Sequence, residues 1–146
     1  MRAVILSLLL SFAAAYAQDD IRFTSVEVFL NSSVPVAAWQ FELTDKNGSM
    51  KVVGVENGES NAFAGTPYYD REAVQLGSAD RIVVADFSLR EETGLPSGRV
   101  RIATLHLMIS GTEAPDFDLS LITANRRDGQ VIDASIDLVE PRGSEQ

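Results

Sequence analysis

The sequence contains no cysteine and only one histidine, His106. The lack of cysteine excludes disulfides, thiolate metal ligands and a cysteine nucleophile. A Ser-His-Asp triad would have to use His106, and no nucleophile motif accompanies that residue. Zinc-ligand spacings and an EF-hand loop are also missing. The sequence therefore predicts a protein that is not an enzyme and that needs no cofactor.

Basic residues are scarce as well, since 12 Lys and Arg face 21 Asp and Glu, for a net charge of −9. Such a chain lacks the basic surface that nucleic acid requires, so nucleic-acid binding is not expected. Calcium stays open, because Asp116 and Asp118 begin one predicted strand and Asp133 and Asp137 share the exposed face of another. A hydrolase with two carboxylates is a weaker alternative, because no spacing singles out a pair.

The one long apolar run lies at the start of the chain. Met1 and Arg2 carry positive charge, residues 3–14 are almost entirely apolar, and Ala15-Tyr16-Ala17 forms a small-residue cleavage site. This order is typical of a secretory signal peptide, here residues 1–17, and the run is shorter than the roughly 20 residues of a membrane-spanning helix. We expect export to a secreted, periplasmic or cell-surface location, with no membrane insertion after cleavage.

The remaining chain has the size of one domain. We expect a single domain over residues 18–140 and a flexible tail over residues 141–146. Short alternating segments separated by turn residues predict an all-β sandwich or barrel. The expected strands cover residues 21–30, 36–43, 50–55, 81–89, 99–109, 117–123 and 130–139.

The alternation within each strand predicts which side chains face the core. Trp39, the only tryptophan, shares its parity with Phe41 and Leu43 and is predicted to be a core residue rather than a platform for sugar stacking. The long strand shifts its apolar parity at Ile102-Ala103, which predicts a β-bulge or a change of sheet. In residues 81–89 the apolar parity predicts an inward set that consists of Val83, Ala85, Phe87 and Leu89.

Five segments together resemble a cohesin domain in their order and spacing, namely residues 38–45 (AWQFELTD), 50–58 (MKVVGVENG), 81–87 (RIVVADF), 98–107 (GRVRIATLHL) and 134–139 (ASIDLV). One departure is Trp39, where a phenylalanine would be usual. The resemblance implies an antiparallel jelly-roll sandwich of about nine strands, a fold shared with certain carbohydrate-binding modules. It also implies a non-catalytic protein. Cohesins bind dockerin modules on a flat sheet face, and the related modules bind polysaccharide.

Residues 56–80 do not alternate and form the one long loop expected in the chain, with a short strand or a helical turn at residues 71–76. Two adjacent tyrosines in this loop cannot both be buried if the chain is extended. We therefore predict a ligand-binding site that consists of Tyr68, Tyr69, Asp70 and Arg71. The alternative is a structural role, in which Tyr68 or Tyr69 caps the open end of the sandwich.

The alternative site is the polar sheet face that carries Gln40, Glu42 and His106. The sequence favours polysaccharide-associated carbohydrate binding as the function. The alternative is docking of a protein module, of the dockerin type or another, on a sheet face.

Overall fold

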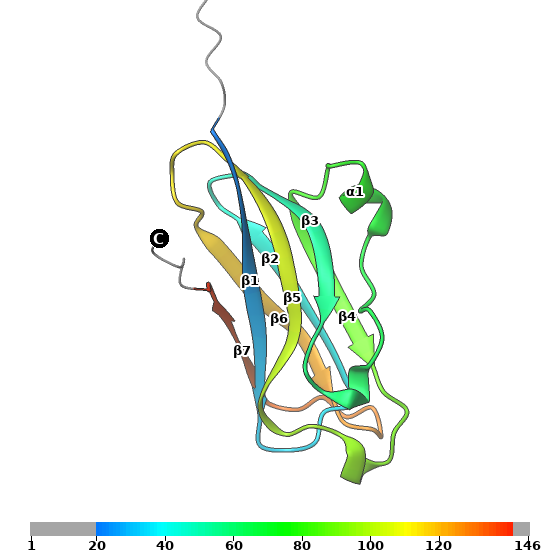
Figure 1. Cartoon of the computed structure of the whole chain (residues 1–146). Coiled ribbons are helices and arrows are strands. Elements are labelled where there is room, and N and C mark those ends of the chain that lie inside the picture. The colour runs from blue at the N-terminus through cyan, green and yellow to red at the C-terminus, as the bar shows by residue number, and fades with distance from the viewer. Residues whose placement is uncertain (1–19, 142–146) are drawn as a thin grey trace, which may run out of the picture.

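The structure is a computed structural model that describes residues 20–141. Two antiparallel sheets pack face to face (Figure 1). The four-stranded sheet has the order β3-β5-β1-β7, formed by Met50–Asn57, Gly98–Ser110, Ile21–Ser32 and Ala134–Val139. The three-stranded sheet has the order β4-β2-β6, formed by Arg81–Phe87, Ala38–Asp45 and Phe117–Asn125. The predicted signal peptide and residues 142–146 of the predicted tail lie outside the described residues.

The all-β sandwich is confirmed, with seven strands in the described residues rather than about nine. Single bridges at Tyr68–Ala85 and Asn125–Val131 are too short to count as strands. The loop after β3 forms a 3-10 turn at Asn61–Phe63 and the helix α1 at Arg71–Gln75, so the predicted helical turn is present.

Strand β2 places Trp39 in the core, as its alternation predicts. Trp39, Phe41 and Leu43 are buried, while Gln40 between them is only half-buried. The Trp39 ring stacks on Phe41 at 5.7 Å between centroids and meets the edge of Phe63 at 5.9 Å. The prediction of a core tryptophan is confirmed.

Strand β4 has the opposite orientation to the one predicted. Ile82 and Val84 are buried, whereas Phe87 and Leu89 are 52% and 82% exposed. Apolar residues occupy both parities of this strand, so its alternation is ambiguous. Pairing with β2 decides the orientation, because Val84 lies opposite the buried Phe41 and residues opposite each other share a face.

The predicted bulge in β5 is confirmed. Val28 lies opposite Ala103 and Phe29 lies opposite Arg101, so Ile102 is the extra residue. Ile102 and Ala103 are consequently both buried although they are adjacent in sequence.

The turn between β2 and β3 is held by the buried carboxylate of Asp45. It accepts hydrogen bonds from the backbone N–H groups of Asn47 (3.1 Å), Ser49 (2.9 Å) and Asp116 (2.9 Å), and from the Ser49 hydroxyl (2.7 Å). Burial alone would raise the pKa of the Asp45 carboxyl, but the hydrogen bonds from Ser49, Asp116 and Asn47 outweigh it and hold that pKa below its ordinary value. Asp45 thus joins the β2–β3 turn to the start of β6.

Replacement of Asp45 by alanine is expected to lower the free energy of unfolding by about 1–3 kcal/mol near neutral pH, because three backbone N–H groups lose their acceptor. A carboxyl whose folded pKa is depressed stabilises the fold above its unfolded pKa of about 3.9, and this contribution is lost as the pH falls through the folded pKa. Urea unfolding at pH about 7 and below about 3 should show the gap between wild type and Asp45→Ala narrowing in acid.

The control for this measurement is Asp118→Ala, which removes an exposed carboxylate close to the same turn. It should change the free energy of unfolding by less than about 0.5 kcal/mol at either pH. A gap between wild type and Asp45→Ala that stays constant down to the lowest pH would contradict the depressed pKa.

Candidate functional site

Tyr68 extends the three-stranded sheet beyond β4. Its N–H donates to the Ala85 carbonyl at 2.8 Å, and its carbonyl accepts from the Ala85 N–H at 3.0 Å. The Tyr68 ring stacks on Phe87 with 5.9 Å between centroids and 8° between the planes. Both side chains are exposed, Tyr68 by 62% and Phe87 by 52%. An exposed aromatic pair therefore stands at the β4 margin of this sheet.

The outer surface of this sheet is called the docking face below. Its rows follow the strand register, in which Gln40 lies between Ala85 and Thr123, and Ala38 lies between Phe87 and Asn125. Most side chains of the face are small, polar or apolar, and these comprise Tyr68, Ala38, Gln40, Val83, Ala85, Phe87, Ser120, Ile122 and Thr123. The charged side chains Glu42, Arg81 and Asp118 lie toward the end of the face away from Phe87, where Glu42 forms an ion pair with Arg81.

The other three residues of the predicted loop site have structural contacts. Tyr69 is half-buried against the core, and the Arg71 guanidinium lies 5.2 Å above its ring. Asp70 caps α1, because its Oδ1 accepts from the Ala73 N–H at 2.9 Å. The expectation that at least one of the two tyrosines is exposed is confirmed by Tyr68. A role in binding for Tyr68, Tyr69, Asp70 or Arg71 stays a prediction.

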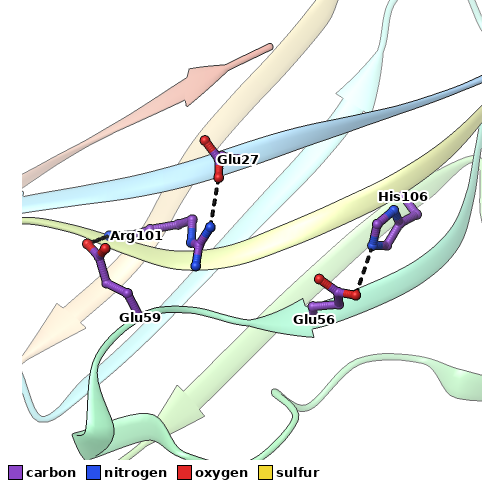
Figure 2. Close-up of polar contacts among 5 residues, drawn as sticks. All are labelled: Glu27, Glu56, Glu59, Arg101 and His106. Atoms are coloured by element: carbon purple, nitrogen blue, oxygen red, sulfur yellow. Dashed lines mark hydrogen bonds and ion pairs between the residues drawn. The ribbon is translucent and has the colours of Figure 1, made fainter. Parts of the chain in front are cut away.

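The structure does not bring the three residues of the alternative site together. Gln40 and Glu42 lie on β2, in the three-stranded sheet, whereas His106 lies on β5, in the other sheet. Figure 2 shows His106 beside Glu56 of β3, with 3.3 Å between Nε2 and Oε1. Placing Gln40, Glu42 and His106 on one face was wrong, because alternation separates inward from outward side chains but does not say to which sheet a strand belongs.

Comparison with known proteins identifies the architecture. No family model matches the sequence, and no curated protein matches it. The structure is similar to a chain in the crystal structure of a CaDoc0917–CaCohA2 complex at pH 5.5, with a TM-score of 0.55 and 14% identity over 77% of this chain and 82% of that chain. The chain has a cohesin-like fold. At this identity the similarity concerns the fold alone.

A cavity of about 470 Å³ lies beside the docking face of the cohesin-like sandwich. Tyr68, Phe87, Asp86 and the loop around Phe63 line it. Burial raises the pKa of the Asp86 carboxyl above its ordinary value, and a 2.8 Å hydrogen bond from the Phe87 N–H opposes that rise in part. The aromatic pair thus has a polar recess next to it.

Sequence reasoning missed Phe87 as a site residue, because the parity assigned to residues 81–89 directed its side chain inward. One feature of the sequence could have indicated this position. Apolar residues occupy both alternating sets of β4, so one set has to face outward, and it is the set that contains Phe87.

Metal ligands are not clustered in residues 20–141, where no three His, Asp or Glu side chains are placed to hold a metal ion. Of the aspartates considered for calcium, Asp137 is bound to Arg99 at 2.8 Å. Calcium binding through Asp116, Asp118 or Asp133 stays a prediction. No helix in the described part of the chain is long and apolar enough to cross a membrane.

Proposed function

We propose that this protein is an exported, non-catalytic module that docks a partner protein on the docking face, with Tyr68 and Phe87 as anchors. The observation that carries the proposal is the exposed aromatic pair at the margin of a sheet surface of small, polar and apolar side chains. Protein interfaces are enriched in aromatic residues and depleted of charge at their centres. The cohesin-like fold supports docking by analogy only.

Carbohydrate binding, which the sequence favoured, has weaker support. A sugar ring stacks on a free aromatic face, and such platforms present rings side by side. Tyr68 and Phe87 are only two rings, and no third exposed aromatic in residues 20–141 extends them into a row, because Phe23 lies on the other sheet. The pair is therefore better suited to fill a shallow apolar contact than to line up along a polysaccharide chain.

The test of this function is capture of a partner from the proteins that the source organism exports, with the chain immobilised as bait and a glycan array run in parallel. The double variant Tyr68→Ala/Phe87→Ala should bind the captured protein about thirtyfold more weakly, as expected for a loss of about 2 kcal/mol. Its thermal midpoint should change little, because both rings are exposed.

Two control variants are available in the chain. Val53→Ala shortens an apolar side chain that is 41% exposed on β3 of the four-stranded sheet and should leave binding unchanged. Tyr69→Ala should lower the thermal midpoint instead, because Tyr69 packs against the core. The proposal is wrong if the double variant binds the partner as wild type does, or if the array yields a glycan whose binding depends on Tyr68 and Phe87.

A further inference from the structure

Strand β7 pairs with only part of the edge of β1. Its ladder runs from Glu27, opposite Val139, to Ser32, opposite Ala134. Among the described residues, the first half of β1 is paired with β5 alone. Residues 21–26 therefore form an open strand edge, called the β1 edge below. It lies on the same side of β1 as β7, beyond the end of that strand (Figure 1).

Two hydrogen bonds determine which backbone groups point toward this open side. The carbonyl of Asp20 accepts from the Gly111 N–H at 2.7 Å, so the backbone groups of Asp20 face β5. Ser110 lies opposite Ile21, but its N–H donates to the Ser49 carbonyl at 3.0 Å, on the β3 side. The backbone groups of Ile21 therefore face away from β5.

The N–H and C=O groups of successive residues alternate between the two edges of an antiparallel strand. Those of Phe23 and Ser25 consequently point in the same direction as those of Ile21, toward the open side. The side chains of Ile21 and Phe23 are 55% and 71% exposed. Three residues thus direct backbone donors and acceptors toward the open side, and two of them, Ile21 and Phe23, also carry exposed apolar side chains.

Charged side chains, proline and bulges normally prevent strand addition at an edge. Residues 21–26 contain no Lys or Pro, and the ladder irregularity comes only after Val28. Their one charged side chain, Arg22, is held by the carbonyls of Gly111 and Glu113. Two other edges are partly covered, since the Ala79 carbonyl accepts from the Val52 N–H on β3 at 2.8 Å and Tyr68 pairs beside β4.

We infer that the β1 edge pairs with the β1 edge of a second copy of this chain, antiparallel and around a two-fold axis at Phe23. In this register Phe23 lies opposite Phe23 of the second copy, and Ile21 lies opposite its Ser25. Each edge-facing N–H then meets a carbonyl of the other copy. Such an isologous contact is closed, and the aromatic pair at its axis stabilises the ladder.

The charge pattern supports a second copy as the occupant. In the same register Arg22 lies opposite Thr24, and Asp20 lies opposite Val26, so no like charges face each other between residues 20 and 26. Arg22 is also held by its own chain, because it donates to the carbonyls of Gly111 and Glu113, both at 2.7 Å. The net charge of −9 opposes association of two copies through acidic surfaces, whereas residues 21–26 of the β1 edge contain no Asp or Glu.

The first test is sedimentation equilibrium of the purified chain between about 1 μM and about 1 mM, a range suited to a weak dimer. The weight-average mass should rise toward twice the monomer mass. Phe23→Lys places two ammonium groups opposite each other and should weaken association at least about tenfold, whereas Phe23→Tyr should retain it. Val131→Lys makes the same charge change at a residue that is 73% exposed outside the edge and should have no effect.

The second test follows the backbone. The Phe23 amide should exchange quickly in dilute solution and become protected at high concentration, while the Thr24 amide, which faces β5, should be protected at both. Ser25→Pro removes one edge-facing N–H without removing a bond to β5, as proline is tolerated on edge strands, and it should also weaken the dimer.

Four results would overturn the inference. A mass that stays monomeric at the highest concentration excludes the dimer. A dimer that survives both Phe23→Lys and Ser25→Pro is formed through another surface. A Phe23 amide that is already protected in dilute solution means that the edge is covered within one chain. If the chain stays monomeric alone but its Phe23 amide becomes protected when a captured partner protein is added, the β1 edge binds that partner instead of a second copy.

Discussion

Replacement of Trp39 by alanine is expected to lower the free energy of unfolding by about 3–5 kcal/mol. Trp39 is 1% exposed and lies between the rings of Phe41 and Phe63, so its removal leaves a cavity that neighbouring strands cannot close. The indole N–H has no hydrogen-bond partner among the described residues. Trp39→Phe removes that unpaired donor and keeps most of the stacking, so its cost should be much smaller than that of Trp39→Ala.

Urea unfolding of the two variants measures this difference directly. Because Trp39 is the only tryptophan, the native fluorescence should be blue-shifted and poorly quenched by iodide. Phe87→Ala is the matched control, since this aromatic is 52% exposed and its loss should cost less than about 1 kcal/mol. A tryptophan that iodide quenches readily in the folded protein would contradict the buried position.

Alternation predicted the core where polar residues mark the opposite face of a strand. Gln40 and Glu42 alternate with Trp39 and Phe41 in β2, so only one orientation buries the apolar set. In β4 both parities are apolar, and pairing with β2 determined the orientation. That pairing joins segments about forty residues apart, for which local alternation carries no information.

The same distinction applies to the site. Exposure of a tyrosine in the loop followed from local geometry, because Tyr68 and Tyr69 are adjacent and point to different sides. The partner of Tyr68 could not be predicted, because Phe87 reaches it only through the bridge between Tyr68 and Ala85. His106 was grouped with Gln40 for a related reason, since both face outward but on different sheets.

Gly58 is the other position where a single methyl group should have a large effect. The residue follows β3, and a Cβ there would lie 2.0 Å from the Arg101 carbonyl oxygen and 2.7 Å from the Ile102 Cα. These are backbone atoms of β5 at its bulge, so they cannot turn away as a flexible side chain could. Gly58→Ala is therefore expected to lower the free energy of unfolding by about 3 kcal/mol, the upper part of the range for overpacking.

The contacts after Gly58 explain why the chain cannot simply move outward. The Glu59 N–H donates to the Arg101 carbonyl at 3.0 Å, and the Arg101 N–H donates to Glu59 Oε1 at 2.8 Å. Figure 2 shows Glu59 beside the backbone of Arg101, while the guanidinium of Arg101 donates to Glu27 on β1. An outward shift of Gly58 that relieves the clash would break both hydrogen bonds between Glu59 and Arg101, and the segment that follows β3 would detach from the sheet.

Gly65→Ala is the matched control, because its Cβ would have no atom within 4 Å and Gly65 does not have a positive φ. This variant should be neutral or more stable by up to about 1 kcal/mol, since alanine reduces the freedom of the unfolded chain. Urea unfolding of the two variants should therefore give effects of opposite sign or very different size. Equal stability of Gly58→Ala and Gly65→Ala would mean that β3 leaves the sheet without the close approach to β5, because only that approach distinguishes the two glycines.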